Sequence, residues 1–182
     1  MRLFIAIKFS RTIEQQLVQV QNDFRRLNVT GHYTDVKNLH LTLAFIGEYD
    51  RPKTVMDALK SVDFTPFELT LKDGVGHFGN LYWVGLEKSP QLMSLSASVR
   101  QALEEYRIPF DRKPFNPHIT LLRKAVFAPQ QEQALQQIAV EPIKMTASKI
   151  SLMHSHYVNR QTVYTEIGSA AAKPHEAGGT EA

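Results

Sequence analysis

The chain has 182 residues, of which 43% are hydrophobic, so it is long enough for one good core or two small coupled lobes. Its 21 basic and 18 acidic residues leave a net charge of only +3, too small to indicate nucleic-acid binding by itself. The absence of cysteine excludes disulfides, thiolate zinc sites and cysteine nucleophiles. With no apolar run of membrane-spanning length, we expect a soluble cytoplasmic protein.

Strands and helices alternate along the chain. Ser10 is a candidate N-cap for a helix over 10–28, and Ser89 with Pro90 begins a second helix that runs to Arg107. Shorter helices are predicted at 52–61 and 130–139, and strands at 2–9, 40–48, 67–78, 80–87, 118–127, 145–156 and 161–167. Residues 169–182 have no periodicity and few large apolar side chains, so they are predicted to form a disordered tail.

One motif of the form N-x-H-x-T-L occurs twice, as "NLHLTL" over 38–43 and "NPHITL" over 116–121. The two histidines are 78 positions apart. At this offset the strand over 2–8 falls on 80–86, the two long helices overlap, and 67–78 falls on 145–156. The agreement in element order predicts an α+β fold in which residues 1–168 form a single bilobal domain, with two similar lobes related by an approximate two-fold axis.

The two motifs place the same side chains on the same face of each strand. Because side chains alternate, His40 and Thr42 point to one face and the leucines beside them to the core. The same holds for His118 and Thr120. A single strand histidine is more often structural, but two identical pairs in matching positions favour a shared site between the lobes.

Paired histidines suit hydrolysis of a phosphoester. An in-line displacement needs a proton taken from water on one side of phosphorus and a proton given to the leaving oxygen on the other. Imidazole does either near neutral pH, since its ordinary pKa is about 6.5. Threonine hydroxyls can hydrogen-bond the phosphate oxygens, and the scheme requires no metal.

The stretches "NLHLTLAFIGE" over 38–48 and "KPFNPHITLLRK" over 113–124 resemble the 2H phosphoesterase superfamily. They are most similar to its RNA 2′,3′-cyclic phosphodiesterases, the LigT-like group formerly called 2′-5′ RNA ligases. The resemblance implies two antiparallel sheets facing across a central cleft. It also implies hydrolysis of 2′,3′-cyclic phosphate, on RNA ends or nucleotides, to a 2′-phosphate without a cofactor. By position, His40 would be the general acid, His118 the general base, and Thr42 and Thr120 the phosphate-binding threonines.

Phe45 and Arg123 each lie five residues past a motif histidine, where the family has residues that flank the nucleotide. Simple alternation sends an odd offset to the opposite face, so both side chains need a twist or bulge to reach the cleft, aided by Gly47 near Phe45. The alternative, a core phenylalanine and a solvated arginine, stays open.

Other readings also remain open. "HSH" over 154–156 has a spacing seen in metal sites, but without an acidic residue close by in sequence we favour a surface or cleft-edge strand. Asn38 and Asn116 are expected to fix each strand's start through local backbone hydrogen bonds. Alternative functions are a 2′-5′ RNA ligase or 2′-5′ phosphodiesterase, or a non-catalytic RNA-end binding module, which would not need both imidazoles. We expect a monomer.

Overall fold

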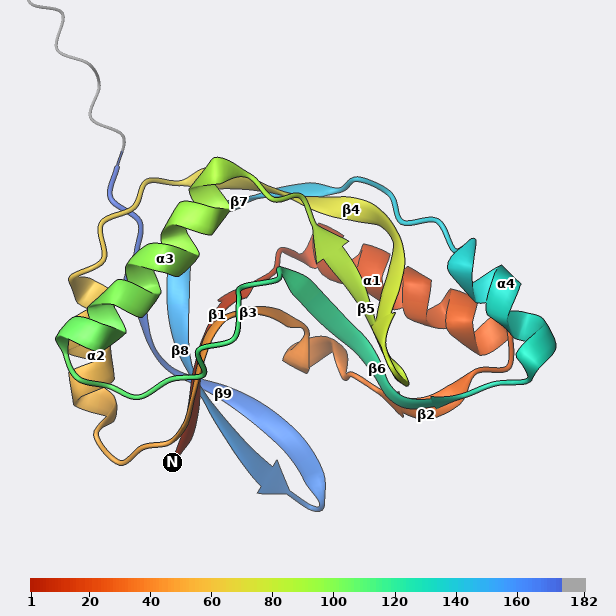
Figure 1. The fold of residues 1–182 in the computed structure, drawn as a ribbon, viewed down its shortest axis with the longest axis horizontal. Helices are drawn as coiled ribbons and strands as arrows, with labels where there is room; N and C mark the ends of the chain where they lie inside the picture. Colours follow the sequence, from red (N-terminus) through yellow and green to blue (C-terminus); the bar gives the residue numbers. More distant parts are fainter. Residues whose placement is uncertain (175–182) are drawn as a thin grey trace, which may run out of the picture.

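The structure is a computed structural model that describes residues 1–174. Its strands form two antiparallel sheets (Figure 1). The first sheet has the order β3-β1-β8-β9, with bounds His40–Glu48, Arg2–Lys8, Lys149–Val158 and Gln161–Ala171. The second has the order β2-β6-β5-β4-β7, with bounds Thr30–Tyr33, His118–Val126, Leu81–Leu86, Phe67–Phe78 and Lys144–Ala147.

The helices cover the two sheets in pairs: α2 and α3 pack on the first sheet, and α1 and α4 pack on the second (Figure 1). Ser10 and Ser89 are N-caps, because their hydroxyls accept hydrogen bonds from the backbone N–H groups of Ile13 and Leu92. Both long helices therefore begin where the sequence predicts. The helices α1, α2, α3 and α4 span Arg11–Arg26, Pro52–Lys60, Pro90–Glu105 and Glu132–Gln136, and 3-10 turns span Val36–Asn38 and Pro129–Gln131.

The two halves of the chain exchange strands. β3 and β6 each begin at a motif histidine and each have nine residues, which agrees with the repeat offset. The row β3-β1-β8 in the first sheet corresponds to β6-β5-β4 in the second. However, β4 comes from the first half of the sequence but lies in the second sheet, and β8 comes from the second half but lies in the first sheet. The predicted fold class is confirmed, and neither half completes its sheet without a strand from the other.

A continuous apolar core joins the lobes, since one cluster of buried side chains includes residues of both sheets. On β1, Leu3, Ile5 and Ile7 point into this cluster, whereas Phe4 and Ala6 point to the opposite face. This second face of the first sheet is the one that lines the space between the sheets. β1 is therefore apolar on both faces, which hides its alternation in the sequence.

A buried glutamine of α1 anchors the second motif strand. The Gln21 side chain is 3% exposed, and its Nε2 donates to the backbone carbonyls of Thr34 and Leu121, at 2.9 and 3.0 Å. The Leu121 carbonyl also accepts the Thr34 N–H, at 2.9 Å. The loop before β3 is thus tied to β6, which couples the two motifs through the backbone.

Three element predictions need correction. The polar loop before the first motif contains β2, which pairs with β6 through main-chain hydrogen bonds that side-chain patterning does not reveal. The single strand predicted over 145–156 is two strands that separate at Ser148 and join different sheets. The helix predicted over 130–139 is shortened to one 3-10 turn and α4.

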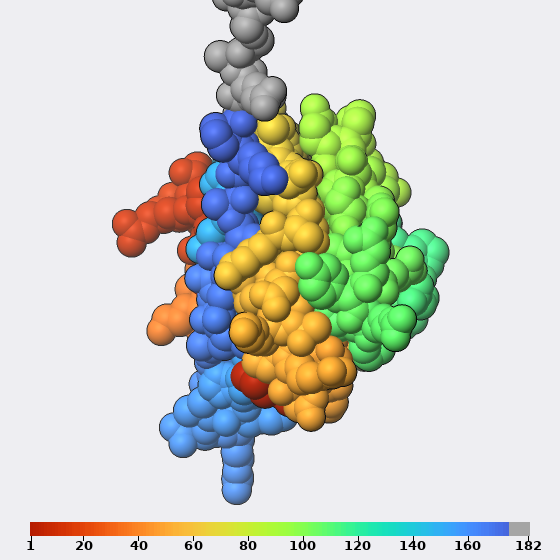
Figure 2. Space-filling model, turned by 90° about the vertical axis from the view of Figure 1, so that its left-hand side faces the viewer, coloured from red at the N-terminus to blue at the C-terminus, as the bar shows by residue number. Residues whose placement is uncertain are grey.

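The boundary predicted for the C-terminal tail is also wrong. β9 continues to Ala171, where Ser169 and Ala170 pair with Ser151 and Ile150. Beyond the strand, the Lys173 N–H donates to the Phe64 carbonyl at 2.8 Å. Figure 2 shows this blue end of the chain against the yellow segment that follows α2. The small residues at 169–171 can join the strand because the edge of β8 bonds them through backbone groups alone. Residues 175–182 lie outside the described part of the chain.

Among residues 1–174, no helix is long and apolar enough to cross a membrane.

Candidate active site

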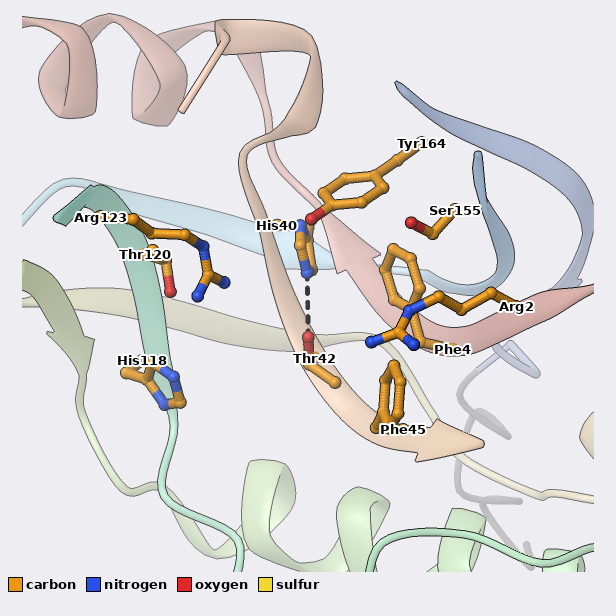
Figure 3. Close-up of a pocket in the computed structure, with 10 residues that line it drawn as sticks. All are labelled: Arg2, Phe4, His40, Thr42, Phe45, His118, Thr120, Arg123, Ser155 and Tyr164. Atoms are coloured by element: carbon orange, nitrogen blue, oxygen red, sulfur yellow. Dashed lines mark hydrogen bonds between the residues drawn. The ribbon is translucent and has the colours of Figure 1, made fainter. Parts of the chain in front are cut away.

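A cavity of about 190 Å³ between the two sheets contains both motifs (Figure 3). β3 supplies His40, Thr42 and Phe45 to its wall, and β6 supplies the corresponding residues of the second motif. All six residues singled out from the sequence therefore lie around one space. The ten lining residues are Arg2, Phe4, His40, Thr42, Phe45, His118, Thr120, Arg123, Ser155 and Tyr164.

Matching β-bulges bring the fifth residue after each histidine into the cavity. On β3, Thr42 and Ala44 pair with consecutive residues of β1, which leaves Leu43 as the extra residue. On β6, Thr120 and Leu122 pair with consecutive residues of β5, which leaves Leu121 as the extra residue. Each bulge reverses the alternation after the threonine, so Phe45 and Arg123 share a face with their histidines.

The two histidine rings are oriented in the same way. Nδ1 of His40 lies 2.6 Å from the Asn38 carbonyl, and Nδ1 of His118 lies 2.7 Å from the Asn116 carbonyl. A carbonyl only accepts, so each Nδ1 carries a hydrogen and donates. In both rings Nε2 is therefore the nitrogen available for proton transfer.

The two histidines differ in their surroundings. Nε2 of His40 lies 2.9 Å from Oγ1 of Thr42, while the second motif has no corresponding bond within the described chain (Figure 3). Burial lowers the pKa of His40 to about 4, although the bond to Asn38 opposes the shift, and the charges of Arg123 and His118 lower it further. His40 is thus neutral near pH 7, and the Thr42 hydroxyl donates to its Nε2.

Aromatic side chains surround His40 on the first lobe. The ring of Phe4 lies 4.9 Å from the imidazole, and that of Tyr164 meets it edge-on at 5.2 Å. The guanidinium of Arg2 lies 4.8 Å from the Phe45 ring. These contacts make an apolar wall with a cation at its edge, and the same wall accounts for the desolvation of His40.

Sequence reasoning missed four cavity residues: Arg2, Phe4, Ser155 and Tyr164. They lie on strands far from either motif in sequence and reach the cavity only through strand pairing. Phe4 pairs with Phe45 across β1 and β3, and Ser155 pairs with both Arg2 and Tyr164. The two-residue spacing of Arg2 and Phe4 was the one available signal, and the apolar run from Leu3 to Ile7 obscured it.

On the second lobe, Trp83 and Phe78 surround His118, with ring centroids 6.0 and 5.4 Å from the imidazole. Gly76, opposite Trp83 on β4, makes room for the indole, because a Cβ there would collide with the ring. This glycine belongs to the packing behind His118 and not to the cavity wall.

Asn38 makes longer-range contacts than predicted. Its Nδ2 donates to the Thr162 carbonyl at 2.9 Å, and its Oδ1 accepts the backbone N–H of Tyr164 at 3.2 Å. The side chain thus fastens β9 to the first motif, while the backbone carbonyl orients His40. The Asn116 side chain makes no such bond within residues 1–174, so only its carbonyl has the corresponding role.

The "HSH" pair lies on the face of β8 away from the cavity, since Ser155 between the two histidines lines it. The two imidazoles stack at 4.9 Å, and Nε2 of His156 hydrogen-bonds Oγ1 of Thr165 at 2.8 Å. Within the described residues, no cluster of three potential metal ligands includes them. The surface-strand interpretation fits this placement.

Comparisons with known proteins agree with this geometry. A family model described as the 2′-5′ RNA ligase superfamily matches residues 11–159. The RNA 2′,3′-cyclic phosphodiesterase of Thermotoga maritima is 27% identical over 173 residues, covering 90% of this chain and 91% of the relative. That of Escherichia coli is 33% identical over 131 residues, covering 68% of this chain and 72% of the relative.

Two solved structures share the architecture. Escherichia coli LigT complexed with 3′-AMP superposes with a TM-score of 0.75 and 26% identity, covering 94% of this chain and 96% of that one. A structure from Thermus thermophilus superposes with a TM-score of 0.77 and 25% identity, covering 97% and 100%. The resemblance drawn from the two motifs is confirmed, and the chain belongs to the 2′-5′ RNA ligase superfamily.

Proposed function

We propose that this protein hydrolyses 2′,3′-cyclic phosphates, on RNA ends or nucleotides, to 2′-phosphates by acid–base catalysis from two histidines. The observation that carries the proposal is the convergence of two equivalent His/Thr pairs, from opposite sheets, on one cavity. The relatives named RNA 2′,3′-cyclic phosphodiesterase support the reaction class. A binding module alone would need neither the second imidazole nor the shared orientation of the two rings.

In the proposed reaction, Nε2 of His118 accepts a proton from water, whose oxygen forms a new bond to phosphorus. Nε2 of His40 donates a proton to O3′ as the bond between phosphorus and O3′ breaks. The hydroxyls of Thr42 and Thr120 hydrogen-bond the non-bridging oxygens, where negative charge gathers. The phosphate remains on O2′, and no step uses a metal ion.

Phe45 and Arg123 flank the nucleotide from opposite lobes. The chemical difference between them makes the pseudo-symmetric cavity unequal at its two ends. An apolar ring on one side and a guanidinium on the other allow the cyclic phosphate only one orientation. This asymmetry favours loss of one ribose oxygen over the other and therefore a single product.

His40 can act as the acid only after it gains a proton. Its pKa of about 4 leaves it neutral in the empty cavity near pH 7. A bound phosphate anion beside the ring favours the imidazolium, because an opposite charge a few ångströms away raises a histidine pKa. The substrate therefore supplies the charge that makes its own acid catalyst effective.

The test offers a 2′,3′-cyclic nucleotide and a cyclic-ended oligonucleotide to the protein with EDTA present, and identifies the product by phosphorus NMR. We expect the 2′-phosphate alone. A 3′-phosphate would show that the acid and base roles, or the nucleotide orientation, are reversed. Strict dependence on added divalent metal would contradict the mechanism. Joining of a cyclic end to a 5′-hydroxyl end, without hydrolysis, would favour the ligase alternative.

A further inference from the structure

We propose that the cavity-side face of the β8–β9 hairpin binds the single-stranded RNA that precedes the reacting nucleotide, with Tyr157 stacking against a base. This inference rests on the proposed function and on His40 as the acid. The expected substrates are RNA chains of two or more nucleotides, which the hairpin distinguishes from free cyclic nucleotides.

The direction of the RNA follows from the in-line reaction. The attacking water and the leaving O3′ lie on opposite sides of phosphorus, so the base His118 and the acid His40 mark the two sides. O3′ is part of the ribose. The ribose, and the chain attached to its 5′ carbon, therefore lie on the His40 side, which is the first lobe.

The cavity itself has room only for the reacting end. Its volume of about 190 Å³ is below the roughly 300 to 1,000 Å³ of typical small-molecule pockets. The preceding nucleotides of an RNA substrate must then lie outside the cavity, along a surface of the first lobe. The surface that continues the cavity wall there is the β8–β9 hairpin, whose turn projects beyond the body of the protein (Figure 1).

Strand register places Tyr157 on the cavity side of this hairpin. Ser155 lines the cavity, and pairing between β8 and β9 is regular from Met153 to Val158. Side chains two residues apart on a regular strand share a face, so Tyr157 lies beyond Ser155 by about 7 Å. Tyr157 is 79% exposed, the largest exposure among the large hydrophobic side chains of residues 1–174.

The chemistry of this surface matches single-stranded RNA. An exposed aromatic ring stacks on any base, which gives affinity without sequence specificity. Arg160, in the hairpin turn, and Arg2, at the cavity edge, have no ion-pair partner within residues 1–174. Arg2 and Arg160 therefore lie at the two ends of the surface proposed to bind RNA, where their charges can contact backbone phosphates.

The experiment compares the wild-type protein with Tyr157→Ser, Tyr157→Phe and Val158→Ser, using a 2′,3′-cyclic mononucleotide and cyclic-ended oligonucleotides of two to six nucleotides. Val158 neighbours Tyr157 on the opposite face of the hairpin and is also exposed, which makes Val158→Ser a matched control. The measured quantities are kcat/KM for each substrate and the Kd of a 2′-phosphorylated oligonucleotide.

We expect the wild-type protein to prefer oligonucleotides, and Tyr157→Ser to reduce kcat/KM and affinity for them roughly five- to hundredfold while mononucleotide turnover is unchanged. Tyr157→Phe and Val158→Ser should resemble the wild type. Equal effects of Tyr157→Ser on both substrates, or no effect on oligonucleotide affinity, would overturn the inference. If no substrate is hydrolysed, the proposed function fails, and the Kd comparison still decides whether the hairpin binds RNA.

Discussion

The side-chain oxygen of Asn38 accepts a hydrogen bond from the backbone N–H of Tyr164, which fastens the β8–β9 hairpin to the first motif. The backbone carbonyl of the same residue accepts the Nδ1–H of His40. One asparagine thus positions the imidazole of His40 and, through Tyr164, the aromatic wall beside it. Asn116 has only the first of these two roles in the second lobe.

Asn38→Ala is therefore expected to lower kcat about tenfold. The reason is that a small displacement of the His40 imidazole moves it away from the position that the proton transfer requires. Asn116→Ala is the matched control, because both substitutions keep the backbone carbonyl and only Asn38 loses side-chain bonds to β9. Steady-state kinetics on a cyclic nucleotide check this. Equal losses in the two variants would contradict a positioning role for Asn38.

His40→Ala and His118→Ala should each lower turnover by about a hundredfold to ten-thousandfold while the protein stays folded, because each removes one proton transfer. Thr42→Val and Thr120→Val should be milder, since each removes one phosphate hydrogen bond. His154→Ala, on the opposite face of the first sheet, serves as the control and should retain normal rates. A folded His40 or His118 variant with near-normal turnover would refute the paired mechanism.

The pKa of His40 should rise when substrate binds. In the empty cavity burial holds it at about 4, so the ring takes up a proton only as the pH falls to that value. An adjacent phosphate anion favours the imidazolium, and the ring then takes up a proton at a higher pH. By linkage, binding should tighten as the pH falls through the raised pKa. Proton NMR of His118→Ala, with and without cyclic nucleotide, measures both values; an unchanged pKa would argue against His40 as the acid.

Gln21→Leu should reduce the free energy of unfolding by about 1–3 kcal/mol, because the Thr34 carbonyl loses its bond and the Leu121 carbonyl keeps only one. The exposed Gln19→Leu, on the same helix, is the control and should change stability little. Urea denaturation at constant pH compares the two. Since Leu121 is the bulge residue of β6, a fall in kcat that accompanies the Gln21 substitution would show that the bulge also moves.

Removal of residues 169–182 should destabilise the protein, because it deletes the end of β9 and the backbone bonds that Ala172 and Lys173 donate to Ser148 and Phe64. This replaces the expectation, from composition alone, that the whole segment is disordered. Removal of only 175–182 is the matched control, and its lack of large apolar residues predicts little change. Equal melting temperatures for the two truncated proteins would show that the end of β9 contributes nothing.

The sequence by itself determined the repeat, the class of fold and the two His/Thr pairs. These follow from local rules: Ser10 and Ser89 cap their helices through neighbouring backbone groups, and strand alternation places His40 with Thr42 and His118 with Thr120. Even the need for a twist or bulge was apparent, because simple alternation sends Phe45 and Arg123 to the face opposite the histidines. The bulges at Leu43 and Leu121 meet that requirement, whereas Gly47 lies at a second register shift of β3, after Phe45.

Only the tertiary structure decided which strands complete each sheet and what surrounds each histidine. The exchange of β4 and β8 between lobes brings Ser155 and Tyr164 to His40, more than a hundred residues away in sequence. The low pKa of His40 likewise depends on the aromatic wall that this pairing builds. Side-chain patterns record which face of a strand is buried, but main-chain hydrogen bonds choose its neighbours, and these bonds look the same for every residue type.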